Sequence, residues 1–222
     1  MGVAISAMSQ PIARFYFVAL PILEQRSFEP SIIVDLPNSI KPENMSQINV
    51  VSGKNCRIAP TAILENVVCG DNVSIGNFAE LKNIVIGDDS KIGGHVVMYS
   101  PDETKPIRIG KNVVVAHGTY GEATGGEIHI SDNASVAHRC TLLTSSDSPW
   151  SPELESIYPL QCGGITMHQH TWIGVGCTVL PNVVLNEGII VGAHSLIRPG
   201  TYKPWTLYGG TPCKELKTIA RK

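Results

Sequence analysis

The sequence predicts an all-β fold in which short strands wind into a triangular solenoid. The first observation is a six-residue repeat that starts at Met167 and reads MHQHTW, IGVGCT, VLPNVV, LNEGII, VGAHSL and IRPG. The second is the chemistry of its columns, because the first position is apolar and the fifth is small or β-branched. Neither a helix, with about 3.6 residues per turn, nor an alternating strand recurs with this period, so the hexads form an internal repeat.

Each hexad is expected to form a short strand followed by a corner, and three hexads of about 18 residues complete one coil. First-column side chains then stack inside the solenoid. Corner pairs such as DN, DD and KN supply residue types that tolerate turn conformations. The same register recurs upstream, with first-column residues Ile63, Cys69, Ile75, Leu81, Ile86, Ile92, Met98, Ile109, Val115, Ile130, Val136 and Leu142.

The repeat divides the chain into three parts. Residues 1–55 contain no hexads and are expected to form an N-terminal cap or an oligomer contact. Residues 56–200 form the solenoid, and residues 201–222 form a short C-terminal extension. The register breaks at Tyr99–Pro106, at the glycine-rich Gly118–Glu127 and at Ser145–Gly164, and function should collect at such breaks. The third is too long for a corner and is expected to project as an arm.

Composition narrows the function classes. Seventeen basic and nineteen acidic residues give a formal charge of -2, and no long basic run suggests nucleic-acid binding. The six cysteines show no metal-binding or disulfide spacing, which favours reduced thiols in a cytoplasmic protein. The apolar N-terminus contains Pro11 and Arg14, so we expect neither a signal peptide nor membrane insertion.

Seven histidines are candidates for proton transfer, a role that suits imidazole near neutral pH. Gly94, His117, His138 and Val175 each follow the start of a second strand by two residues. His117 and His138 are therefore expected on adjacent coils at one edge, about 5 Å apart. The remaining histidines occupy other corner or strand positions and rank lower; they are His95, His129, His168, His170 and His194.

Residues 56–214 resemble the hexapeptide-repeat acyltransferases, a family of left-handed parallel β-helices that includes enzymes of sugar and polysaccharide biosynthesis. The left-handed coil comes with the resemblance and not from the period. The resemblance also implies a homotrimer with one site at each subunit interface, and an arm that helps to wall that site.

The segment Tyr208–Lys214 (YGGTPCK) is similar to the closing element of hexapeptide acetyltransferases, with Cys213 where alanine is usual. The resemblance implies that this segment clasps coenzyme A, the carrier of acetyl-CoA as co-substrate. Glycine admits a close ligand, proline stiffens the bend and lysine offers a cation to phosphate. The residues expected to contact the cofactor are Trp172, Gly174, Gly192, Gly210, Pro212 and Lys214.

The stretch Val136–Cys140 (VAHRC) resembles the V-x-H-D-C segment that carries the base in family members acetylating nucleotide-linked amino sugars. This implies His138 as the catalytic base, with His117 as the second candidate. Arg139 stands where that family has an acid, so the orienting partner is sought at Asp147, Glu122 or Glu127. The family's sugar O-acetyltransferase branch has its histidine just before the arm, where Ser145–Asp147 contains none. Acceptor contacts are expected from Tyr120, Glu122, Asp147 and Trp150.

The sequence therefore predicts an acetyl-CoA-dependent transferase acting on a hydroxyl or amine of a sugar, free or nucleotide-linked, for surface polysaccharide biosynthesis. An antibiotic or amino acid is the alternative acceptor, and the acceptor can also lose its proton without a protein base. Two further alternatives stay open. One is a zinc enzyme resembling gamma-type carbonic anhydrase, although no His-x4-His spacing occurs and no metal is expected. The other is a non-catalytic scaffold.

Overall fold

The computed structural model describes residues 47–146 and 151–220. All of them belong to the second of two units, which spans 42–222. Residues 1–46, most of the expected N-terminal cap, lie outside the described residues, as do Asp147 and Trp150.

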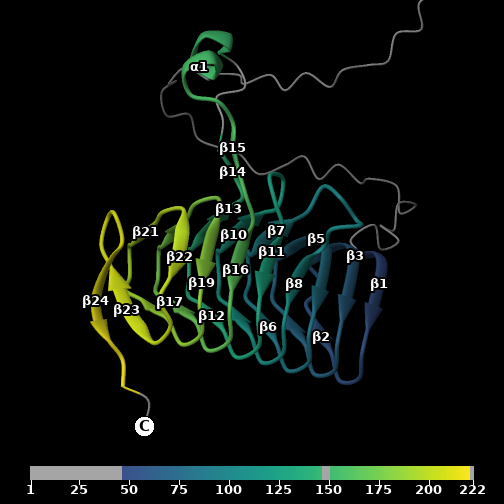
Figure 1. Cartoon of the computed structure of the whole chain (residues 1–222). Helices are drawn as coiled ribbons and strands as arrows, with labels where there is room; N and C mark the ends of the chain where they lie inside the picture. Colours follow the sequence, from purple (N-terminus) through teal and green to yellow (C-terminus); the bar gives the residue numbers. More distant parts are fainter. Residues whose placement is uncertain (1–46, 147–150, 221–222) are drawn as a thin grey trace, which may run out of the picture. The chain divides into compact units, whose positions relative to one another are not determined.

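The described residues form a parallel β-solenoid with three faces, as the repeat predicts (Figure 1). The first face contains β8 (Ile107–Ile109), β11 (Ile128–Ile130), β16 (Ile165–Met167), β19 (Val183–Leu185) and β22 (Gly200–Tyr202). The second contains β2 (Arg57–Ile58), β4 (Ser74–Ile75), β6 (Lys91–Ile92), β9 (Val114–Val115), β12 (Ser135–Val136), β17 (Trp172–Ile173), β20 (Ile190–Val191) and β23 (Thr206–Gly209). The third contains β7 (Val97–Tyr99), β10 (Tyr120–Glu122), β13 (Thr141–Leu143), β18 (Thr178–Val179) and β21 (Leu196–Ile197).

Three longer strands turn the corner from the third face into the first: β1 (Gln47–Ser52), β3 (Ile63–Cys69) and β5 (Glu80–Ile86). Parallel pairing therefore starts at Gln47, ahead of the expected residue 56. It also continues past residue 200, because β23 pairs in parallel with β20. The last strand, β24 (Lys214–Thr218), folds back antiparallel on β23.

Apolar ladders fill the interior and confirm the predicted columns. Equivalent residues of neighbouring coils face each other, as Val115 faces Val136 and Val136 faces Ile173. Burial of these side chains supplies the main favourable free energy of folding. The ladder of the second face consists of Ile75, Ile92, Val115, Val136, Ile173 and Val191, each at most 3% exposed.

Corner residues lock the register of the coils. Asn49, Asn66 and Asn83 share a left-handed backbone conformation at successive corners. The Asn49 side-chain amide donates to Asn66 at 2.9 Å, and the Asn66 amide donates to Asn83 at 2.8 Å. Asparagine and aspartate tolerate this conformation better than most residues with a side chain. Asn72, Asp89 and Asn112 of the predicted DN, DD and KN pairs adopt it too, so the predicted turn chemistry of the corners is confirmed.

Coils pack closely at the corner between the second and third faces, where glycine recurs. A Cβ on Gly76 would lie 2.5 Å from the backbone N of Gly94. We expect Gly76→Ala to lower the free energy of unfolding by about 1–3 kcal/mol, because the next coil has to shift. Gly192 is the matched control, since a Cβ there would meet its nearest atom at 3.6 Å. Equal thermal unfolding temperatures for the two alanine variants would contradict this expectation.

All three register breaks lie at the corner between the third and first faces. The second is shorter than expected, because β10 continues the coil through Glu122 and leaves only Ala123–Glu127 outside it. The third projects as an arm (Figure 1). Its base is an antiparallel pair, β14 (Ser145–Ser146) with β15 (Gln161–Cys162), and it carries helix α1 (Pro152–Ile157).

The described helix is far too short and polar to cross a membrane. The six cysteines are free thiols, as their spacing predicts.

Candidate functional site

One edge of the solenoid carries both candidate bases and two of the glycines expected to contact the cofactor. We call it the histidine edge and define it as the corner between the second and third faces: 76–78, 93–95, 116–118, 137–139, 174–176 and 192–194. Its backbone ladder confirms the predicted column. Arg139 N–H donates to His117 O at 3.0 Å, and Gly176 N–H donates to His138 O at 2.9 Å. His117 and His138 are thus at equivalent positions of adjacent coils, and both are exposed.

The ring of His117 lies against an unexpected partner, His95 of the preceding coil. The two ring centroids are 5.1 Å apart, with the planes at 66°. Gly94 makes this possible, because a Cβ there would come within 3.3 Å of His117 Nδ1. The sequence placed His95 at an exposed corner, which is correct, but did not reveal its contact with the candidate base.

The C-terminal hairpin, Gly209–Lys214, is attached to the same edge. Gly210 N–H donates to Ser195 Oγ at 3.0 Å, and the Thr211 hydroxyl donates to His194 O at 3.1 Å. Gly210 has φ of +101°, a conformation that favours glycine. Pro212 and Lys214 are exposed in this hairpin, so the structure brings the expected clasp residues to the edge that carries the histidines.

Two other expected cofactor residues differ in their surroundings. Gly174 is pressed against the next coil, because a Cβ there would lie 2.7 Å from Ala193 N, and this packing alone accounts for a glycine. Trp172 begins β17 on the outer surface of the second face and is 49% exposed. It lies two residues from the histidine edge and is open to a ligand.

Glu122 lies at the corner between the third and first faces, where its side chain contacts the base of the arm. Its side chain is 5% exposed, although the sequence suggested an acceptor contact. Oε1 accepts from the backbone N–H groups of Thr144 at 2.8 Å and Ser145 at 3.0 Å. Oε2 accepts from the backbone N–H and hydroxyl of Thr124. The carboxylate is therefore engaged at the base of the arm and is a positioning residue, remote from His138.

The orienting acid expected for His138 is therefore not provided by Glu122. Glu127 also lies at the corner between the third and first faces, at the end of the glycine-rich segment. Asp147, the third candidate, lies outside the described residues. The residue beside His138 in the sequence, Arg139, is exposed on the histidine edge.

Tyr120 lies on the third face, between the histidine edge and the arm. Its hydroxyl is 3.1 Å from that of Tyr99, and the ring centroids are 6.2 Å apart. Partial burial, followed by the hydrogen bond with Tyr99, raises the pKa of Tyr120 to about 12. The phenol therefore stays protonated and able to donate a hydrogen bond at neutral pH.

This shift predicts an effect of alkaline pH. An unfolded tyrosine ionises near pH ~10, so the stability gained from the neutral phenol is present below that pH. It is lost as the pH rises toward about 12. The unfolding temperature of Tyr120→Phe should therefore fall less steeply with pH in this window than that of wild type. The raised pKa values of Cys69 and Cys213, both about 11, act equally in both proteins. Identical slopes would show that Tyr120 ionises normally.

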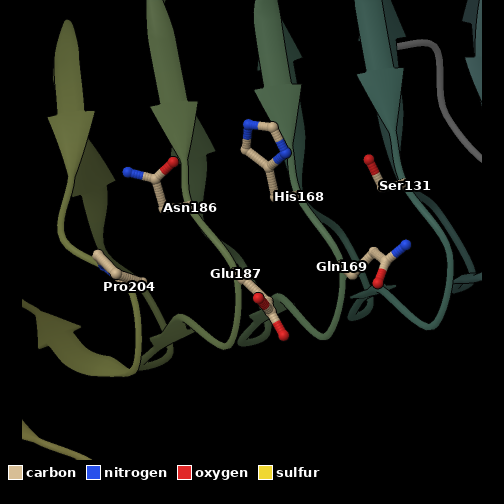
Figure 2. A pocket seen from close by; sticks show the side chains of 6 residues that line it. All are labelled: Ser131, His168, Gln169, Asn186, Glu187 and Pro204. Carbon is tan, nitrogen blue, oxygen red and sulfur yellow. The ribbon is translucent and has the colours of Figure 1, made fainter.

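A separate hollow of about 400 Å³ lies at the corner between the first and second faces (Figure 2). It is lined by Ser131, His168, Gln169, Asn186, Glu187 and Pro204. The side-chain amide of Asn186 already makes one hydrogen bond within the protein, because it donates to Tyr202 O at 2.8 Å. Within 47–146 and 151–220, no three histidine, cysteine or acidic side chains gather in a way that could hold a metal ion.

Comparison with known proteins gives acyltransferases of sugar biosynthesis as relatives, although no family model matches. The chain is 29% identical over 103 residues to dTDP-4-amino-4,6-dideoxy-D-glucose acyltransferase of Escherichia coli, covering 44% of this chain and 53% of the relative. It is 33% identical over 73 residues to "Putative lipopolysaccharide biosynthesis O-acetyl transferase WbbJ" of Escherichia coli strain K12, covering 32% and 37%. The matches thus span about half or less of these curated relatives.

A solved structure extends the likeness along most of the solenoid. It is a variant of AntD, an N-acyltransferase from Bacillus cereus, in complex with dTDP-4-amino-4,6-dideoxyglucose and coenzyme A. It matches with a TM-score of 0.52 and 25% identity, over 79% of this chain and 86% of that chain. The fold predicted from the repeat is therefore that of a known acyltransferase.

Proposed function

We propose that this chain is an acetyl-CoA-dependent acyltransferase that moves an acetyl group to a hydroxyl or amine of a sugar, free or nucleotide-linked. The observation that carries the proposal is the histidine edge. Two exposed histidines stand there in one register column, and the C-terminal hairpin closes the same edge. The acyltransferase relatives support both the reaction and the class of acceptor, because two of them name a dTDP-linked amino sugar.

His138 is the proposed catalytic base. Its side chain is exposed, so an acceptor can reach it from solvent. As the acceptor's oxygen or nitrogen bonds to the acetyl carbonyl carbon, the imidazole takes the acceptor's proton. The carbon–sulfur bond of the thioester then breaks, and the proton is returned to the leaving thiolate. His117 is the alternative base, one coil away.

The hairpin and its neighbours are the proposed donor site. Coenzyme A supplies the acetyl group as an activated thioester. The Lys214 ammonium is exposed and has no carboxylate within ion-pair distance among the described residues, so it is available to a phosphate. Gly210 leaves the bend open, since a Cβ there would meet its nearest atom at 3.4 Å. Gly192 and Trp172 extend this donor site along the solenoid.

The finer parts of the proposal concern assembly and biology. We propose a homotrimer in which the arm of one subunit helps to wall the site of the next, since flat prism faces suit closed cyclic packing. Residues 1–46 serve as a cap or as part of that contact. The product supplies lipopolysaccharide or another surface polysaccharide, and transfer takes place in the cytoplasm.

The decisive experiment is a thiol-release assay with acetyl-CoA and a panel of free sugars and nucleotide sugars. Antibiotics and amino acids form the second panel. We expect release only with a sugar acceptor, and calorimetry should show acetyl-CoA binding. A protein that binds no acetyl-CoA would contradict the proposal and favour a scaffold. Stoichiometric zinc in the purified protein would instead favour hydration chemistry of the carbonic anhydrase type.

A further inference from the structure

We propose that the histidine edge from Phe78 to Arg139 binds a nucleoside diphosphate, with Phe78 as the stacking platform for the base and Arg139 as the ligand of the diphosphate. The inference rests on the proposed function and sharpens it, because it assigns a nucleotide-linked sugar rather than a free sugar as acceptor. It also assigns His138, and not His117, to the reacting sugar.

Phe78 is the first observation. Its ring is 54% exposed, and its backbone has φ of 57°, in the left-handed region that bulky residues rarely adopt. The equivalent corner positions of the later coils also have positive φ, and Phe78 is the one apolar aromatic residue among them; the others are His95, Gly118, Arg139, Gly176 and His194. A large aromatic side chain that is both strained and exposed stabilises the fold little, and such outliers collect at binding sites.

The second observation is a line of rings that leads from Phe78 to the candidate bases. The Phe78 and His95 centroids are 5.0 Å apart, with the planes tilted by 32°. His95 in turn contacts His117 at 5.1 Å. These separations match the spacing of neighbouring strands, so one ring stands on each coil. A planar base can stack on the open face of such a platform, whatever the identity of the base.

Arg139 provides the charge that the diphosphate requires. It is exposed, and its Cγ would lie 3.4 Å from a Cβ on Gly118, so its side chain leans over that glycine, beside His117. None of the ion pairs among the described residues involves its guanidinium. A guanidinium can hold two phosphate oxygens at once, which a histidine or lysine cannot do as well.

The order along the edge matches the order of groups in a nucleotide sugar. The base lies on Phe78, the ribose passes His95, and the diphosphate meets Arg139 above Gly118. The sugar then reaches the next coil, where His138 stands. The donor approaches from the other end, where the Gly209–Lys214 hairpin is attached. Acceptor and donor therefore meet at His138 from opposite directions.

The test uses the purified full chain and calorimetric titration with dTDP and, separately, with coenzyme A. Phe78→Asn removes the ring and introduces a residue that the chain already uses in this conformation at Asn72 and Asn112. We expect about tenfold weaker dTDP binding, from the loss of stacking, with an unchanged or raised unfolding temperature. Arg139→Gln should weaken dTDP binding to a similar extent but leave thymidine binding unchanged. Val114→Asn, on the exposed second face, is the control and should change neither.

Three outcomes would overturn the inference. In the first, Phe78→Asn binds dTDP as tightly as wild type. In the second, it weakens coenzyme A binding instead, which would give the ring to the donor's adenine. In the third, wild type binds acetyl-CoA and releases thiol with free sugars but binds no nucleoside diphosphate. The third result leaves the proposed function intact, whereas failure to bind acetyl-CoA would reject that function itself.

Discussion

Replacing His138 by alanine is expected to lower kcat by about 10²- to 10⁴-fold, because the acceptor must then lose its proton without a positioned base. The KM for acetyl-CoA should stay close to that of wild type, since the donor residues are unchanged. His138→Ala should also bind dTDP normally, because the proposed nucleotide contacts, Phe78 and Arg139, are unchanged. This combination separates loss of chemistry from loss of binding.

Two further histidine variants test the assignment. His117→Ala is expected to lower kcat much less, because His117 lies beside the proposed diphosphate site and not beside the reacting group of the sugar. His129→Ala is the matched control, since His129 is exposed on β11 of the first face, away from the histidine edge. Full activity in His138→Ala would eliminate the assignment. If His117→Ala alone lost activity, the base would move one coil toward the N-terminus.

The second large effect is expected at Glu122. Glu122→Ala leaves the buried N–H group of Thr144 and the half-buried N–H group of Ser145 without their acceptor, together with the N–H and hydroxyl of Thr124. Buried unpaired donors are costly, so the free energy of unfolding should fall by about 3 kcal/mol. For a chain of this size the unfolding temperature should fall by about 6–12 °C. Thermal unfolding followed by circular dichroism measures this.

A structural readout should accompany the loss of stability. Because Glu122 joins the third face to the base of the arm, limited proteolysis of Glu122→Ala should cut the arm faster than in wild type. Glu127→Ala is the matched control, as Glu127 belongs to the same insertion and is exposed. Glu122→Gln keeps one acceptor oxygen and should fall between them. Wild-type protease resistance in Glu122→Ala would show that the arm is held by other contacts.

The fold was predictable because its determinants are local and periodic. A spacing of six places Val115, Val136 and Ile173 in one ladder without any knowledge of distant contacts. The same counting aligned His117 with His138, since backbone register follows from strand length. Counting also found the corners, because asparagine and aspartate are the residue types that accept their conformation.

The parts that escaped prediction depend on side-chain direction and on segments that fold back. The contact of His117 with His95 requires the imidazole to lean over Gly94, which spacing alone does not specify. A carboxylate in a glycine-rich break suggested an exposed Glu122. It is buried because Thr144 and Ser145 return to the same corner after a complete coil. Phe78 shares its backbone conformation with the other corner residues, and only the contact of its ring with His95 and its exposure distinguish it.

All three insertions leave the solenoid at the corner between the third and first faces. The histidine edge therefore runs along the coils without an insertion, and its length is set by the number of coils. Each coil adds one strand spacing, about 4.8 Å, between the proposed nucleobase platform and the donor hairpin. Deleting or duplicating one whole coil would therefore change the length of acceptor that the edge can measure, while the arm and both ends keep their own contacts. The length of the acceptor that such a protein accepts can therefore change through the number of coils, while the catalytic residues on each coil stay the same.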